Sequence, residues 1–159
     1  MGMKIFKIAS ALLVTFLMAT ASAAPYALGS KVKPFTANDQ HGKEFTLDSK
    51  TTYLLLSDDM ATGKITNAAL DKKGKDYLPK KKAIYVANIH GMPAIGRMFA
   101  FRKMKKYSHR IVYGDEKDLM TPFPKHPSHV TVLKLDSAGK VTRISYWDPA
   151  TQDVATHLK

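Results

Sequence analysis

Residues 51–70, TTYLLLSDDMATGKITNAAL, decide how this chain is interpreted. The unbroken apolar run 53–56 is typical of a strand that is covered on both faces. A polar turn follows it, and the next residues begin a helical pattern that continues to Leu78. Open α/β sheets tend to bind ligands at the carboxyl ends of their strands, so we place the candidate ligand-binding site at this turn. Its residues are Asp58, Asp59, Met60, Thr62, Gly63 and Lys64.

The first 23 residues, MGMKIFKIASALLVTFLMATASA, have the features of a secretory signal peptide. Two lysines precede an apolar run that is shorter than the ~20 residues needed to span a bilayer. The segment ends in the small residues Ala-Ser-Ala, which suit cleavage after Ala23. We therefore predict a periplasmic or secreted protein with one domain over residues 24–159 and no transmembrane segment after cleavage.

The chain has no cysteine, and its 25 lysines and arginines against 13 acidic residues give a formal charge of +12. The missing thiols exclude thiol catalysis, disulfide exchange, Cys-ligated zinc and covalent haem attachment. A strongly basic exported domain favours anionic neighbours. We therefore expect an envelope protein or an anionic surface as the partner, whereas export argues against nucleic acid.

Two basic clusters carry much of this charge. The first contains Lys72, Lys73, Lys75, Lys80, Lys81 and Lys82. The second, called the basic patch below, contains Arg97, Arg102, Lys103, Lys105, Lys106 and Arg110. Such clusters can bind an anionic partner, and they can equally serve only to keep helix faces solvated, so both interpretations stay open.

Strand and helix patterns alternate through the middle of the chain. Turn formers at 38–43 predict a β-hairpin. Gly74 interrupts the first helical pattern, and Pro79 is expected to close it. Residues 83–89 predict a second buried strand, after which Pro93 suits the first turn of a second helix.

The last third has a different pattern. A short strand is expected at 110–113, followed by a surface loop. Two apolar runs, 130–135 and 141–147, flank the turn Asp-Ser-Ala-Gly and predict an antiparallel hairpin. Asp148 and the proline after it predict the capped start of a closing helix. The whole order indicates an α/β fold whose mixed sheet has helices on both faces.

Two segments carry a family resemblance. Residues 35–47, FTANDQHGKEFTL, are similar to the motif F-x-L-x-D-x-x-G-K-x-x-x-L, and residues 133–141, LKLDSAGKV, are similar to a hydrophobic-x-hydrophobic-D-x-x-G-x-hydrophobic hairpin. Both motifs occur in the peroxiredoxin-like branch of the thioredoxin fold. The resemblance implies a thioredoxin-like three-layer α/β/α sandwich with a mixed central sheet and an extra N-terminal β-hairpin.

The resemblance also suggests where the family chemistry would lie. Residues 60–63 look like the segment that carries the redox Cys-x-x-Cys, but Met60 and Gly63 stand where the two thiols would be. The cis-proline loop of the family corresponds to His129 and Val130, which we add to the candidate ligand-binding site. The loss of both hallmarks argues against thiol oxidoreductase and peroxidase activity.

A narrower resemblance is to small exported bacterial proteins that are often called FAD/FMN-containing dehydrogenases. It rests on two groups of residues. The first group follows the first predicted core strand and consists of Ser57, Asp59, Met60, Gly63 and Lys64. The second group belongs to the second predicted helix and consists of Met92, Pro93, Phe99, Ala100, Lys103 and Met104. Because no dinucleotide-binding glycine fingerprint follows any strand, we predict no cofactor.

Simpler roles compete for the polar residues. Asp58 and Asp59 are neighbours and should point to opposite sides of the strand, so one of them is expected to cap the helix. Thr62 and Lys64 could instead hold a small anion with the helix amides.

The histidines offer a possible metal site. His126 and His129, with His90, His109 or Asp58, could gather as metal ligands. A proline between two ligands is not a recognised metal spacing, so we predict no metal and assign no catalytic residue.

Two functional hypotheses follow from these observations. The first is a non-catalytic binding or adaptor protein of the cell envelope with a thioredoxin fold. The alternative is a non-thiol oxidoreductase with a bound cofactor at the strand-helix turn. A flavin or haem absorption band in the purified protein would favour the alternative.

Overall fold

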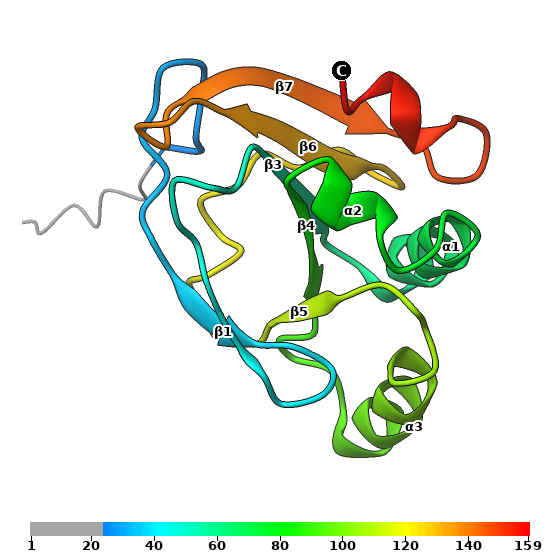
Figure 1. Ribbon diagram of the computed structural model, residues 1–159. Helices are drawn as coiled ribbons and strands as arrows, with labels where there is room; N and C mark the ends of the chain where they lie inside the picture. Colours follow the sequence, from blue (N-terminus) through cyan, green and yellow to red (C-terminus); the bar gives the residue numbers. More distant parts are fainter. Residues whose placement is uncertain (1–23) are drawn as a thin grey trace, which may run out of the picture.

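The computed structural model describes residues 24–159, and the predicted signal peptide lies outside them. Five strands form one mixed sheet in the order β5-β4-β3-β6-β7 (Figure 1). Strands β3, β4 and β5 are parallel, whereas β6 runs antiparallel to both β3 and β7. The bounds are β3 Tyr53–Ser57, β4 Ala83–Asn88, β5 Ile111–Gly114, β6 Val130–Leu135 and β7 Val141–Trp147. The mixed sheet and the hairpin of its last two strands are confirmed.

The helices pack on one face of this sheet (Figure 1). They are α1 Met60–Asp71, α2 Tyr77–Lys80, α3 Ala94–Met104 and the 3-10 helix η1 Val154–Thr156. The core on this face joins Leu70 of α1 and Leu78 of α2 to Leu55 and Tyr85 of the strands. The two crossovers that contain α1 and α3 step in the same direction along the sheet, and right-handed connections then place both helices on the same face.

The other face is covered without a helix among residues 24–159. Its core joins Leu54 and Leu56 of β3 to Val32, Leu47 and Phe123 from the N-terminal segment and the long loop after β5. The predicted third layer therefore exists, but a hairpin and loops form it instead of helices (Figure 1). The order of the strands in the sheet determines which face the helices cover, and the pattern of apolar residues along the sequence does not reveal that order.

The N-terminal hairpin is confirmed as β1 Thr36–Asn38 and β2 Glu44–Thr46. Asp39 closes its turn, because its Oδ1 accepts the backbone N–H groups of His41 and Lys43, both at 2.9 Å. Its Oδ2 accepts Nε–H of Arg110 at 2.8 Å and so ties the hairpin to the start of β5. Burial raises the pKa of Asp39, but these hydrogen bonds outweigh it and hold the pKa below its ordinary value.

We expect Asp39→Ala to lower the free energy of unfolding by about 2–3 kcal/mol, because it removes three charge-assisted hydrogen bonds, one of them to Arg110. Urea denaturation followed by circular dichroism measures the loss. Asp48→Ala is the matched control, because Asp48 is exposed and its carboxylate, within residues 24–159, accepts only the Lys50 N–H at 3.0 Å. Equal losses in the two variants would contradict the proposed anchoring.

The predicted interruption of the first helical pattern is confirmed, since α1 and α2 lie on either side of Gly74, whose φ of +84° is unfavourable for other residues. The predictions for two prolines need correction. Pro79 does not close a helix, since it lies inside α2. Pro93 is the N-cap of α3 and not its first-turn residue.

The predicted closing helix is also wrong. Asp148 caps only one turn, in which it accepts Ala150 N–H at 2.9 Å and the Thr151 hydroxyl at 2.6 Å. Asp153 then starts a new cap by accepting Ala155 N–H at 2.8 Å, and only the short η1 follows. Within residues 24–159, no helix has both the length and the apolar character that crossing a membrane requires.

Candidate functional site

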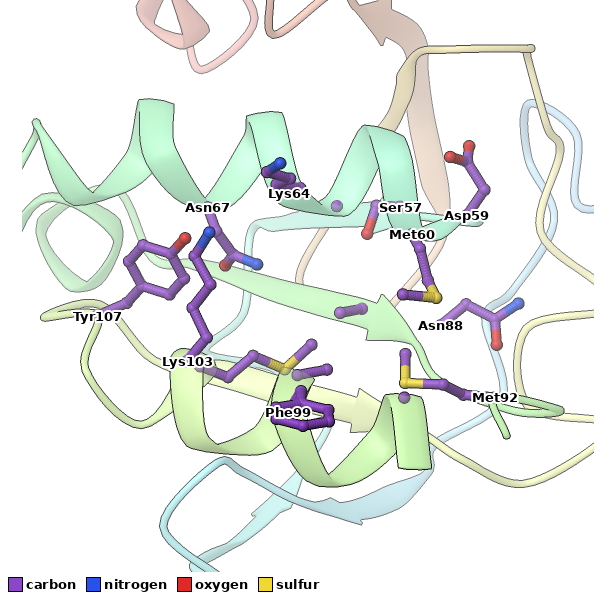
Figure 2. A pocket seen from close by; sticks show the side chains of 15 residues that line it. Ser57, Asp59, Met60, Lys64, Asn67, Asn88, Met92, Phe99, Lys103 and Tyr107 are labelled. Carbon is purple, nitrogen blue, oxygen red and sulfur yellow. The ribbon is translucent and has the colours of Figure 1, made fainter. Parts of the chain in front are cut away.

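An apolar groove of about 320 Å³ lies between α1 and α3, at the carboxyl ends of β3 and β4 (Figure 2). Its volume is at the lower end of the range of ligand pockets. Met60, Met92, Met104 and Phe99 supply most of its apolar wall. The side chains of Met60 and Phe99 remain 57% and 60% exposed, so the groove is open to solvent.

Small residues create this space. Gly63 on α1, Ala87 on β4, and Gly96 and Ala100 on α3 all line the groove. A Cβ atom at Gly63 would lie 3.4 Å from Ser57 Oγ, so even one extra carbon would reach the floor. None of the residues of α3 is fully buried, although Met104 packs against the core. The groove is therefore a gap between the two helices that small residues leave unfilled.

The floor of the groove is polar and mostly hydrogen-bonded. Ser57 Oγ and Tyr85 Oη lie 2.7 Å apart. Asn88 donates from Nδ2 to Asp58 Oδ1 at 3.0 Å and accepts the His90 N–H at 3.0 Å. Ser57 and Asn88 therefore have partners within the protein.

Asn67 completes the floor. Its Oδ1 lies 3.0 Å from His109 Nε2, and both residues are buried. Burial raises the pKa of Tyr107, which lines the same end of the groove and so keeps its phenol proton. Lys64 of α1 and Lys103 of α3 add two exposed positive charges at the rim.

Asp59 takes the capping role at the start of α1. Its Oδ1 accepts the Thr62 N–H at 2.8 Å, and its Oδ2 accepts the Thr62 hydroxyl at 2.7 Å. Burial raises the pKa of Asp59, but the hydrogen bonds from Thr62 and the backbone outweigh it, so the pKa is lowered. A negative carboxylate thus occupies the helix N-terminus, and the Thr62 hydroxyl is already used, which disfavours an anion at this position.

The predicted site residues divide between two places. Asp59, Met60, Gly63 and Lys64 line the groove, whereas Asp58 and His129 border a separate small hollow. In that hollow Asp58 forms an ion pair with Lys125, with Oδ1 and Nζ 2.7 Å apart. Of the two remaining predicted residues, Thr62 is buried in α1 and lines neither space, and Val130 is fully buried in β6 opposite Trp147.

The histidines do not form a metal site in the part of the chain that the structure describes. His126 and His129 are adjacent, with their Nδ1 atoms 3.0 Å apart. However, no group of three or more His, Asp or Glu side chains gathers there as metal ligands. His109, which we considered as a ligand, is buried next to Asn67 instead.

Comparison with solved structures identifies the fold. The chain matches the thioredoxin domain of a thiol-disulfide oxidoreductase from Bacteroides vulgatus with a TM-score of 0.54 and 18% identity, covering 84% of this chain and 99% of that one. It matches a Chlorobium tepidum protein described as thiol:disulfide interchange protein DsbE with a TM-score of 0.58 and 16% identity, over 84% and 95% of the two chains. The chain has a thioredoxin-like fold.

Peroxiredoxin-like structures share this thioredoxin-like fold. Peroxidoxin BcpB from Mycobacterium tuberculosis matches with a TM-score of 0.54 and 15% identity, over 82% of this chain and 96% of that one. No protein-family model matches the sequence, and the comparison with curated proteins finds no relative. The predicted fold class is thus confirmed, and these low identities establish the fold alone.

Two members of the basic patch are paired with carboxylates of the protein. Arg97 forms a bidentate ion pair with Asp115, with both N–O distances at 2.7 Å. Arg110 is held by Asp39 of the hairpin turn. Lys103 lines the groove, and the other members, Arg102, Lys105 and Lys106, are exposed near the end of α3.

Sequence reasoning missed part of the groove. The lining residues that were not predicted as site residues are Ser57, Asn67, Ala87, Asn88, Met92, Gly96, Phe99, Ala100, Met104 and Tyr107. One signal was available in α3, where apolar residues occur on every side instead of one stripe. A helix with that pattern cannot bury all of its apolar surface against one sheet.

Proposed function

We propose that this protein is a non-catalytic binding protein of the cell envelope, and that the groove between α1 and α3 holds an apolar, acidic segment of a partner protein. The observation that carries the proposal is the open apolar groove. Exposed Met60 and Phe99 border it, and such exposed apolar surface usually marks a binding site. Unbranched, polarisable methionines suit this task, because they adapt to differently shaped partners.

Charge complementarity specifies the partner. The groove is bordered by Lys64 and Lys103, and two further lysines, Lys105 and Lys106, continue the positive charge past the end of α3. The whole chain has a formal charge of +12. Complementary charge across an interface accelerates encounter and selects partners. A segment with apolar anchors beside acidic residues therefore fits this surface.

The groove residues support binding better than catalysis. By the thioredoxin-like resemblance, Met60 and Gly63 stand at the redox positions, and both line the groove without a thiol. Asp59, the only acidic residue that lines it, is engaged as a helix cap. The described residues therefore bring no acid–base pair into the groove. The envelope location rests on the signal-peptide pattern of residues 1–23.

Selection of displayed peptides tests this proposal. We expect panning of a random peptide library on the purified protein to enrich peptides that combine apolar residues with Asp or Glu. Phe99→Ala should weaken their binding about tenfold or more, because aromatic anchors commonly dominate such interfaces. Fluorescence anisotropy of labelled synthetic copies measures the dissociation constants.

Met98→Ala is the matched control for this experiment. Met98 is an exposed apolar residue of the same helix that does not line the groove, so its removal should leave the affinity nearly unchanged. Failure to enrich any peptide, or enriched peptides that bind Phe99→Ala as tightly as the wild type, would refute the proposal.

A further inference from the structure

Asn67 has a side-chain amide group, Nδ2, that donates no hydrogen bond within residues 24–159. It lies in the middle of α1, is only 3% exposed, and lines the groove between α1 and α3. Its Oδ1 is paired with His109, but no acceptor within residues 24–159 receives a hydrogen bond from its Nδ2. Nδ2 is also not among the enclosed side-chain atoms that lack a partner, so it opens onto the groove. A ligand in the groove can therefore accept a hydrogen bond from it.

The buried histidine determines which end of the amide faces the groove. His109 Nδ1 is buried without a hydrogen-bond partner, while His109 Nε2 lies 3.0 Å from Asn67 Oδ1. Burial lowers the pKa of His109 to about 4, so the ring is neutral and carries one N–H. An orphaned buried N–H is rarer in proteins than an under-satisfied acceptor. The proton is therefore on Nε2 and is donated to Oδ1, which leaves Nδ2 as the free group.

Two lysines accompany this donor. Lys64 lies one helical turn before Asn67 on α1, and Lys103 reaches across from α3 (Figure 2). All three side chains line the same groove, whose remaining wall is mostly apolar. Hydrogen-bond donors and positive charges that surround one position favour a carboxylate over a neutral acceptor. An apolar wall strengthens this preference, because it lowers the local dielectric.

We propose that Asn67 determines the specificity of the groove by donating from Nδ2 to a carboxylate of the bound segment, while Lys64 and Lys103 balance its charge. This inference rests on the proposed peptide-binding function and names the chemistry that the groove selects. The carboxylate can come from an Asp or Glu side chain or from the C-terminus of the segment. His109 fixes the orientation of the amide and does not touch the ligand.

The test uses synthetic copies of the peptides enriched on the wild-type protein. Each acidic side chain is changed in turn to its amide, and the C-terminus is made free or amidated, which distinguishes the two sources of the carboxylate. With the wild-type protein, changing the recognised carboxylate to an amide should weaken binding about tenfold, the usual effect of losing one charge-assisted hydrogen bond. With Asn67→Asp, which replaces the donor by a charged acceptor, the preference should reverse.

Asn67→Leu is the second variant, because it removes the donor without adding a charge. With Asn67→Leu, the acid and amide peptides should bind within about twofold of each other. A measurement on the unaltered protein adds an independent readout. The side-chain amide resonance of Asn67 in a ¹⁵N–¹H spectrum should shift when the acid peptide is added and should shift much less with the amide peptide.

The outcomes separate this inference from the proposed function. If peptides still depend on Phe99 but prefer the acid form equally with all three versions of residue 67, the role of Asn67 is refuted and groove binding stands. The role of Asn67 is also refuted if the Asn67 side-chain resonance does not shift when the acid peptide is added. If no peptide binds in the groove, both proposals fail.

Discussion

Replacing Trp147 with alanine is expected to lower the free energy of unfolding by about 3–5 kcal/mol, the usual loss when a large buried aromatic side chain is removed. Trp147 is the last residue of β7 and is fully buried. It packs in the core with Val154 and Leu158 of the C-terminal segment. Its indole Nε1–H donates to the Gln152 carbonyl at 2.9 Å, so the residue also holds the turn that replaces the predicted closing helix.

Urea denaturation followed by far-ultraviolet circular dichroism measures this effect, because the variant lacks the only tryptophan and cannot be followed by its fluorescence. Trp147→Phe is the control, since it keeps an aromatic ring but loses the indole hydrogen bond. Its loss should be clearly smaller than that of Trp147→Ala. A loss below about 1 kcal/mol for Trp147→Ala would contradict the central position of this side chain in the core.

The second large effect is a loss of stability in mild acid that depends on His109. Burial, opposed only weakly by the nearby Asp71 carboxylate, lowers the pKa of His109 from 6.5 to about 4. Between these values the unfolded chain binds a proton that the folded chain does not bind, so stability falls as the pH falls. The difference corresponds to about 3 kcal/mol of unfolding free energy between pH 6.5 and pH 4, at 1.36 kcal/mol per pKa unit.

The variant His109→Gln isolates this contribution. Glutamine can still donate to Asn67 Oδ1 but does not titrate, so its stability should fall about 3 kcal/mol less than that of the wild type over the same pH range. Denaturation with urea at a series of pH values between 6.5 and 4 gives both curves. His157, whose pKa burial also lowers, contributes equally to both proteins and cancels in the comparison.

His41→Gln serves as the control for removing a histidine, because His41 is exposed in the hairpin turn. Its stability curve, measured in the same way, shows the effect of replacing an exposed histidine. Parallel curves for the wild type and His109→Gln would show that His109 is not the group that resists protonation.

Local patterns predicted the strands better than the helices. The apolar runs that became β3, β6 and β7 were recognised nearly to the residue, because a covered strand needs consecutive or alternating apolar side chains. The closing helix was wrong because Asp148 and Asp153 each cap a separate turn. Two caps so close together leave no room for a helix between them. The pattern of apolar residues does not show at which of the two aspartates a helix would begin.

The candidate site was only half predictable. The turn between β3 and α1 was found, because the end of a parallel strand followed by a helix is a local signal. The α3 side of the groove was not assigned to the site, although Phe99 and Met104 belong to the narrower resemblance, because a helix with apolar residues on every side does not show which of them stay unburied. Asn67 and His109 are separated by 42 positions in the sequence, and only folding brings them within 3.0 Å.

The sequence by itself determined the absence of thiol chemistry, the positive charge and the α/β order of the thioredoxin-like fold. These properties depend on composition and on short-range periodicity, which folding does not change. The tertiary structure decided that the helices lie on one face, that a groove remains between α1 and α3, and that the Asn67 amide lines this groove. These features depend on strand order and on which side chains meet across the sheet, and that information is not contained in any single stretch of the chain.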